Sequence, residues 1–210
     1  MENKGIINKK IRELKFIALD LEATYSKPIG RHEIIEIGAC RLEPETFNIT
    51  SSYNTLVRPI YPIIPAIKQK TGLTDEIVSK AKPISEIWDE FLNFLQDAIL
   101  LVYKTIDIGI LQRTAKAYGL PLINNSFLDV FRLVKRLYPN EPSYSLKHFQ
   151  QLLRISKISH RAEADAQVTA LLFKHLVEIL ENKYKIFEYK ELVNFCYSNK
   201  LLKNNQGKLF

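Results

Sequence analysis

Residues 15–22 read KFIALDLE, and this stretch decides the interpretation of the rest of the chain. The run is mostly apolar and typical of a strand. Side chains two positions apart on a strand point to the same face, so Asp20 and Glu22 project together. Two buried like charges are costly unless a cation neutralises them, and Mg²⁺ prefers carboxylate oxygens. The alternative is that Asp20 ends the strand and caps a turn while Glu22 faces water.

The residues that follow predict two more strands. After a turn over residues 25–31, the segment 33–41 (EIIEIGACR) is the second strand, and residues 50–57 form the third. Three adjacent strands with short links indicate an antiparallel meander.

The middle and the end of the chain change to a helical period. An apolar stripe runs through residues 84–95, and the short apolar run 98–103 is typical of a strand covered on both faces. Further helices are expected over four segments: residues 107–118, 145–154, 161–181 and 188–197. Strands followed by alternating helices and a strand predict an α/β fold with a mixed sheet flanked by helices.

The composition bounds the class of protein. With 210 residues, 46% hydrophobic and 25% charged, the chain suits one globular domain and excludes a disordered or fibrous protein. No apolar run can cross a bilayer, and the polar N-terminus carries no secretory signal. Cys40 and Cys196 lie far apart without metal-ligand neighbours, which favours free thiols in a reducing, cytoplasmic compartment.

The charge points to a polyanionic partner. The chain has 30 Lys+Arg against 23 Asp+Glu, a formal net charge of +7. A positive field attracts nucleic acid or an anionic membrane surface, although a lysine-rich composition from an AT-rich genome gives the same excess.

Two further acidic motifs stand out. His160 precedes the longest predicted helix, and Asp165 lies in its first turns within the segment SHRAEAD. Acids at a helix N-terminus are favoured by the helix dipole, which explains this motif without any function. Asp107 follows the apolar run 98–103 and starts a helix, where an acid is equally a simple N-terminal residue.

Taken together and in this order, the motifs resemble the DEDD-type (DnaQ-like) 3′→5′ exonucleases of the histidine subtype, the superfamily of the DNA polymerase III epsilon subunit. The three blocks of that family correspond here to FIALDLEAT, IDIGIL and HRAEAD. The segments EIIEIGA, VRP and QKTGLTDEIV also match. The resemblance extends over about residues 15–180, most of the chain.

The resemblance implies a ribonuclease H-like fold and a two-metal phosphodiesterase that uses Mg²⁺ or Mn²⁺. Carried over by motif, the acids bridge and hold the two ions, His160 is the general base, and Thr24 lies near the terminal nucleotide. Asp20 would bridge the ions, and Asp107 would hold one of them through water. The implied catalytic and metal-binding acids are Asp20, Glu22, Asp107 and Asp165.

The second block departs from the family pattern. The family reads His-Asn-x-x-Phe-Asp, whereas Val102 and Tyr103 stand here at the His-Asn positions, ahead of Lys104 and Asp107. Tyr103 and Lys104 either replace the lost contacts to substrate or are plain strand-end residues. The departure concerns substrate positioning more than metal binding.

The leading functional interpretation is an exonuclease that releases nucleoside 5′-monophosphates from nucleic-acid 3′ ends. The segment HRAEADAQVTALL resembles proofreading domains, which favours DNA, whereas DLEAT without a following glycine resembles RNA-trimming members. A polymerase is one candidate partner, which the sequence does not identify, and no membrane is expected. The alternative from another class is a non-catalytic nucleic-acid-binding module with the same fold.

The chain divides into a basic N-terminal arm (1–14), the exonuclease domain (15–181) and a basic C-terminal helix with a flexible tail (182–210). The tail resembles the short Gln-x-x-Leu-Phe peptide that docks on the bacterial sliding clamp. Its candidate partner-binding residues are Gln206, Leu209 and Phe210. The alternative is that the two apolar residues fold back onto the domain.

Overall fold

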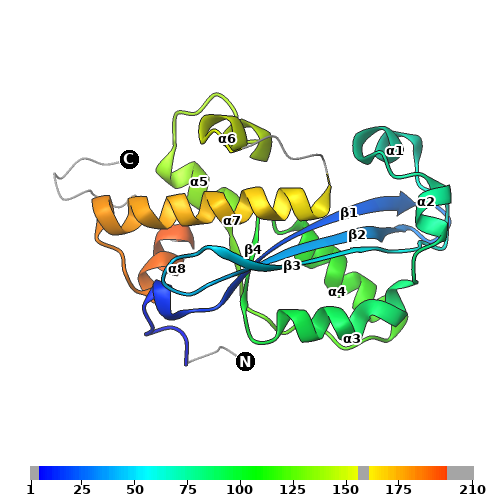
Figure 1. Cartoon of the computed structure of the whole chain (residues 1–210), viewed down its shortest axis with the longest axis horizontal. Coiled ribbons are helices and arrows are strands. Elements are labelled where there is room, and N and C mark those ends of the chain that lie inside the picture. The colour runs from blue at the N-terminus through cyan, green and yellow to red at the C-terminus, as the bar shows by residue number, and fades with distance from the viewer. Residues whose placement is uncertain (1–4, 156–160, 198–210) are drawn as a thin grey trace.

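A five-stranded mixed sheet forms the centre of the computed structural model, which describes residues 5–155 and 161–197 (Figure 1). The strand order is β3-β2-β1-β4-β5. β1 pairs antiparallel with β2, as β2 does with β3, whereas β1–β4 and β4–β5 are parallel. The strands are β1 (Phe16–Ser26), β2 (Arg31–Leu42), β3 (Ile49–Leu56), β4 (Ile99–Val102) and β5 (Phe127–Asp129). The expected α/β fold with a meander and parallel strands is confirmed.

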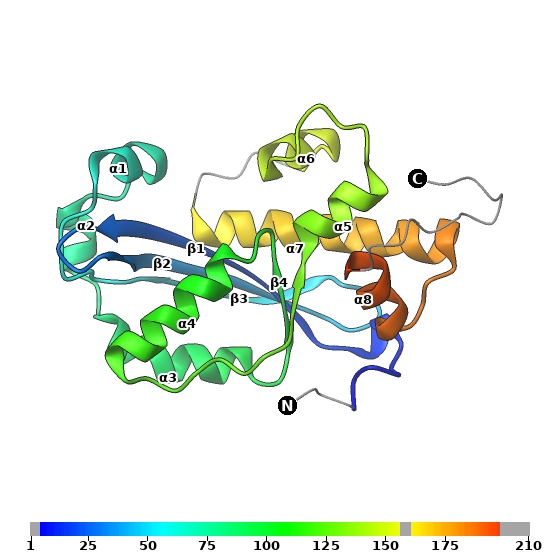
Figure 2. The same cartoon turned by 180° about the vertical axis from the view of Figure 1, so that it is seen from behind.

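Helices cover both faces of this sheet, with α7 along one face and α3 and α4 along the other, while α1 and α2 lie beyond the end of β1 (Figures 1 and 2). The helices are η1 (Ile11–Glu13), α1 (Pro65–Thr71), α2 (Asp75–Ser79), α3 (Ile84–Leu95), α4 (Ile106–Tyr118), α5 (Val130–Leu137), α6 (Leu146–Leu152), α7 (Ala162–Ile179), η2 (Leu180–Tyr184) and α8 (Tyr189–Tyr197).

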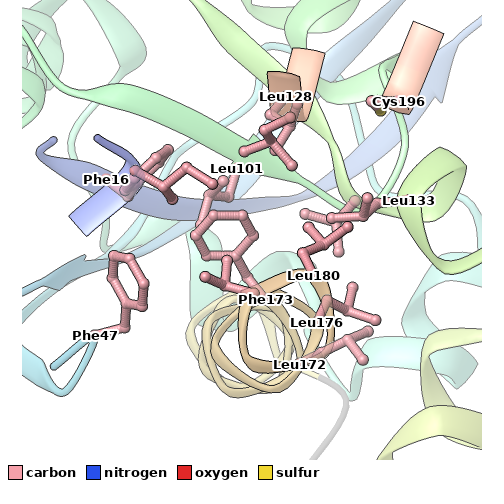
Figure 3. Packing of buried hydrophobic residues seen from close by; sticks show 14 of the residues in the cluster. Phe16, Phe47, Leu101, Leu128, Leu133, Leu172, Phe173, Leu176, Leu180 and Cys196 are labelled. Carbon is pink, nitrogen blue, oxygen red and sulfur yellow. The ribbon is translucent and has the colours of Figure 1, made fainter. Parts of the chain in front are cut away.

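The alternation of side chains along β1 builds two cores, one on each face. Phe16 and Ala18 belong to the cluster on the α7 side, where the Phe16 ring lies 4.9 Å from that of Phe173 (Figure 3). Ile17 and Leu19 belong to the cluster against α3 and α4. A strand repeats every two residues, so the acids at positions 20 and 22 continue the row of Phe16 and Ala18 on the α7 face.

The start of α7 lies directly on β2. A β-carbon added at Gly38 would stand 2.0 Å from the backbone nitrogen of Glu163 and 2.1 Å from the carbonyl carbon of Ala162. These atoms belong to helix backbone and cannot rotate away as a flexible side chain could. Glycine at this position therefore sets how closely the helix approaches the sheet.

The strands and long helices agree with the sequence predictions to within one or two residues at most ends. The main difference is in β1, which continues through Tyr25 and Ser26 because they pair with His32 and Arg31. The turn is therefore shorter than expected and spans residues 27–30. The elements α1, α2, β5 and α5 were not predicted; each has eight residues or fewer, although α5 is amphipathic and buries Val130, Leu133 and Val134.

The N-terminal arm is not loose where the structure describes it. Ile11 is fully buried, and its backbone N–H donates to the carbonyl of Phe187. The Arg12 guanidinium donates to Glu181 through two nitrogens, at 2.7 and 2.6 Å. This segment therefore packs against the elements that follow α7, although its basic composition suggested a free arm.

Two expectations about the environment concern the cysteines and the membrane. Cys40 and Cys196 are both buried and carry free thiols. Within the described ranges, no helix has the length and apolar character needed to cross a bilayer.

We expect Gly38→Ala to destabilise the protein by about 1–3 kcal/mol, because the new methyl group overlaps the backbone of α7. In a protein of this size that loss lowers the melting temperature by roughly 2–4 °C per kcal/mol. Thermal melting followed by circular dichroism measures it. Gly5→Ala is the matched control, since a β-carbon at Gly5 meets no atom within 4 Å. Equal melting temperatures for the two variants would contradict the tight contact.

Candidate active site

Three carboxylates from two elements meet on the α7 face of the sheet. Asp20 and Glu22 come from β1, and Asp165 comes from the first turn of α7. One oxygen of each lies within 4.8 Å of the others. Glu22 is only 2% exposed, so the cluster is not an ordinary solvated acidic patch.

Asp107 reaches the same place from the neighbouring strand. β4 runs parallel to β1 and ends at Val102, which pairs with Leu19, the residue before Asp20. A short turn leads from β4 into α4. Asp107 is the second residue of α4, and it is 8% exposed. It lines a cavity of about 470 Å³ together with Asp20, Glu22 and Asp165. Four acids from three separate motifs of the sequence thus converge on one cavity.

Burial and mutual repulsion disfavour the ionised state of these acids. Burial holds the pKa of Asp20 well above its usual range, and the charges of Asp107 and Asp165 push it further in the same direction. Burial also raises the pKa of Asp107 to about 7, with repulsion from Glu22 as a smaller cause. The cavity therefore holds more negative charge than its own surroundings neutralise.

Lys70 is the cation that the chain itself places among these acids. It lies near the end of α1, and its Nζ donates to both carboxylate oxygens of Glu22, at 3.1 and 3.0 Å. Burial acts to lower the pKa of Lys70, but the hydrogen bond to Glu22 and the negative charges of Glu22, Asp20 and Asp165 together outweigh it, so the net shift is upward. For Glu22, burial raises the pKa although Lys70 opposes the shift. Sequence reasoning missed Lys70; its only signal was its place in the segment QKTGLTDEIV.

The donor set suits a hard divalent cation. Mg²⁺ and Mn²⁺ prefer carboxylate oxygens, and here three such oxygens face one another in a partly desolvated cavity. The raised pKa of Asp20 expresses the same unbalanced charge. The residues present therefore fit a divalent metal site.

An ion pair outside the cavity fixes the start of α7. Glu36 on β2 is fully buried, and the Arg161 guanidinium donates to its carboxylate at 2.6–2.9 Å. The backbone N–H of Ala162 donates to the same carboxylate at 3.2 Å. Since Asp165 follows within the next helical turn, this pair positions it relative to β1.

The predicted substrate residues differ in their surroundings. Tyr103 and Lys104 both line the cavity, and the Tyr103 hydroxyl donates to the carbonyl of Tyr144 at 2.8 Å. Val102 is fully buried in β4, as a plain strand residue would be. Thr24 is fully buried too, and its Oγ1 accepts a hydrogen bond from the backbone N–H of Ile64 at 3.1 Å. In this structure Thr24 therefore supports the chain segment before α1 and does not face the cavity.

Four of the predicted site residues lie outside the part of the chain that the structure describes. These are His160, Gln206, Leu209 and Phe210. For these four residues the sequence-based roles stay predictions.

The fold and the acid cluster define an α/β protein of the ribonuclease H-like class. The profile of the exonuclease family described as RNase_T matches residues 17–173, and the chain belongs to this family. It is 33% identical over 179 residues to DNA polymerase III subunit epsilon of Aquifex aeolicus, a match that covers 84% of this chain and 87% of that protein. The expected superfamily is thus confirmed.

Other relatives are much longer than this chain. It is 32% identical over 171 residues, 80% of its length, to a PolC-type DNA polymerase III of Caldanaerobacter subterraneus, of which the match covers only 12%. Among three such PolC-type relatives the matched share is 12–15%. The chain therefore spans only a small part of these proteins.

Solved structures share the fold at lower identity. The nuclease domain of 3'hExo, described as a DEDDh family member bound to rAMP, superposes with a TM-score of 0.69 at 17% identity, covering 78% of this chain and 92% of that one. Exonuclease I of E. coli with a dT13 oligonucleotide gives 0.67 at 17% identity, covering 87% and 43%. These similarities confirm the expected ribonuclease H-like fold.

We expect the metal-free protein to lose stability as the pH rises from about 4 to about 7. The folded pKa of Asp107 is about 7, above its usual 3.8, so the folded state binds more protons than the unfolded state in this window. Asp107→Asn should flatten the dependence by at least about 1 kcal/mol, or roughly 2–4 °C. Melting curves in chelator at several pH values measure the slope. An unchanged slope in the variant would show that Asp107 does not carry this effect.

We expect Lys70→Met to bind divalent cations about tenfold more tightly than wild type, a change of about 1.4 kcal/mol. The reason is that a cation must displace the ammonium group from Glu22. Titration calorimetry with Mn²⁺ measures the affinity without any substrate. Lys68→Met is the control, because Lys68 lies on the same helix as Lys70 but pairs with Asp75 of α2. Equal affinity in wild type and Lys70→Met would rule out this competition.

Proposed function

We propose that this chain is a metal-dependent 3′→5′ exonuclease that removes nucleoside 5′-monophosphates from DNA 3′ ends. One observation carries the proposal: four carboxylates from three sequence motifs meet in one cavity, in a chain of the exonuclease family. A merely structural role would not require repelling acids to be buried together.

Asp20, Glu22, Asp107 and Asp165 would hold two divalent cations, Mg²⁺ or Mn²⁺. Asp20 would contribute to both, Glu22 and Asp165 to the one beside the attacking water, and Asp107 to the other. When bound, the two ions supply charge stabilisation for the attacking and the leaving oxygen. The ammonium group of Lys70, which now pairs with Glu22, would have to leave that carboxylate for it to hold a cation.

Hydrolysis then requires a proton acceptor for the attacking water, and we assign this role to His160. An imidazole with an ordinary pKa of about 6.5 accepts a proton near neutral pH. The water oxygen forms a bond to the phosphorus of the last phosphodiester, and the bond from phosphorus to O3′ breaks. O3′ takes a proton from solvent water, and the shortened strand leaves with a 3′-hydroxyl. His160 directly precedes Arg161, which the buried Glu36 holds in place.

DNA is the favoured substrate, because the relatives at 32–33% identity are named as DNA polymerase III proteins. They are a DNA polymerase III subunit epsilon and a PolC-type DNA polymerase III. RNA is the alternative, since one solved neighbour at 17% identity is titled for 3'-end recognition of a histone mRNA stem-loop. Tyr103 and Lys104 line the cavity and would contact the strand, whereas Thr24 is buried, does not line it and would act only by supporting the segment before α1.

The wider setting follows from the same relatives. A role in replication or repair beside a polymerase is the natural context, and the buried free cysteines suit a cytoplasmic protein. Docking on a sliding clamp rests on Gln206, Leu209 and Phe210 alone. The domain division also stays a proposal, although the core continues beyond residue 181 through Leu192 and Phe195 of α8.

We expect the protein to shorten 5′-labelled single-stranded DNA from its 3′ end with Mg²⁺ or Mn²⁺ and to be inactive in excess chelator. Asp20→Asn and Asp165→Asn should abolish activity, and His160→Ala should lower turnover about 10²–10⁴-fold with binding kept. Glu163→Gln is the control, an acid on the same helix that does not line the cavity. Matched DNA and RNA substrates on a sequencing gel provide the measurement.

Each alternative has its own outcome in this assay. Faster digestion of RNA than of DNA would reverse the substrate assignment. Full activity in chelator would remove the two-metal mechanism. Tight binding of every substrate without cleavage would identify a non-catalytic binding module.

A further inference from the structure

Two lysines and two aromatic rings form a cluster beside the acidic cavity. The Nζ of Lys104 lies 5.4 Å from the ring centroid of Phe131. The Nζ of Lys135 lies 5.7 Å from the same ring and 5.6 Å from the ring of Tyr144. The two rings are themselves in contact, with centroids 6.3 Å apart. We refer to Lys104, Phe131, Lys135 and Tyr144 as the lysine-aromatic cluster.

The rings orient the ammonium groups without neutralising them. A cation over an aromatic face is attracted by the ring quadrupole and keeps its full charge. In contrast, Lys70 and Lys68 are paired with carboxylates. Among the residues that the structure describes, no ion pair involves Lys104 or Lys135, and both side chains are exposed. The cluster therefore offers two positive charges to an external anion.

The cluster is continuous with the cavity. Tyr103 links the two, because it lines the cavity and packs edge-on against Phe131 at 5.9 Å. Its hydroxyl also donates to the backbone carbonyl of Tyr144. Lys104 lines the cavity itself, and so does Ser145, which follows Tyr144 in the chain. An extended ligand whose end lies among the acids can thus pass directly onto the cluster.

We propose that the lysine-aromatic cluster binds backbone phosphates of the strand that leads to the 3′ end, upstream of the bond to be cleaved. This inference rests on the proposed exonuclease function, which places the 3′ end among the four acids. Those acids repel a polyanion, so the strand needs cationic contacts close by. Lys104 and Lys135 supply them from two different elements, the turn before α4 and helix α5. Phosphate contacts fix the register of a strand without reading its sequence.

Binding as a function of salt tests the proposal without any cleavage. The probe is a 5′-fluorescein single-stranded oligonucleotide in chelator, followed by anisotropy. Each of Lys104→Met and Lys135→Met should reduce the slope of log affinity against log salt by about 0.7, the value for one contact to a single strand. The weakening should be similar for different sequences. Lys116→Met, an exposed lysine near the other end of α4, is the control. Wild-type slopes in both variants would overturn the proposal.

A comparison of two substrates separates the cluster from the cavity. The p-nitrophenyl ester of thymidine 5′-monophosphate carries a scissile phosphodiester but no upstream phosphate. Lys135→Met should lower the ratio of kcat/KM on an oligonucleotide to kcat/KM on the ester by about tenfold, or about 1.4 kcal/mol. An equal loss on both substrates would show that the substitution acts through the cavity and would overturn the proposal. If the protein cleaves neither substrate but the salt slopes fall as expected, the exonuclease function is wrong and the cluster stands.

Discussion

Repulsion among four carboxylates in one cavity is the constraint on which the rest of the site depends. Asp20, Glu22, Asp107 and Asp165 would separate if their backbones were free to move, because burial and mutual repulsion both disfavour their charges. The fold opposes this by fixing the acids in the middle of a central strand and at the beginnings of two helices. Two apolar cores on opposite faces of β1 hold these elements rigidly. Stability elsewhere in the protein thus maintains an unfavourable arrangement at the site.

Much of the positioning comes from polar groups that never reach the cavity. The carboxylate of Glu33 accepts hydrogen bonds from the backbone N–H groups of Ile60 and Tyr61, and Thr24 accepts one from Ile64. These bonds hold the segment that leads into α1, which carries Lys70. On the other side, Glu36 holds the start of α7. Strands β1 and β2 therefore position both the helix that supplies an acid and the helix that supplies a cation.

Periodicity predicted the parts of the fold that are long and regular. The two-residue repeat of β1 placed Asp20 and Glu22 on one face, and the helical repeat placed α3, α4 and α7 within one or two residues. Periodicity did not predict that Asp107 and Asp165 would lie beside those two acids. Whether the four acids meet depends on which strands pair and in which direction. That step came from the family resemblance. Lys70 was missed because its seven-residue helix has no apolar stripe to define a face.

Buried charge was equally hard to foresee. In the segment EIIEIG, Glu33 and Glu36 flank Ile34 and Ile35, and an acid in such a position ordinarily faces water. Glu36 is instead fully buried, because Arg161 and a backbone N–H from α7 satisfy its carboxylate. Its partner is 125 residues away in the chain. No local sequence pattern indicates which residue so far along the chain will pair with Glu36. Ion pairs of this kind can therefore be identified only once the topology of the fold is known.

The charges around the cavity are arranged so that cations and a polyanion favour each other. The acids alone repel a nucleic-acid strand, and the exposed lysines alone attract it at any position along its backbone. A divalent cation held by the acids would offset part of their negative charge at the place where the proposed function puts the 3′ end. Binding of the strand would then strengthen binding of the cation, because the coupling between two ligands is reciprocal. Lys70 reduces the repulsion in the absence of both ligands, and it does so from a helix at the rim of the cavity, where its ammonium group is free to leave.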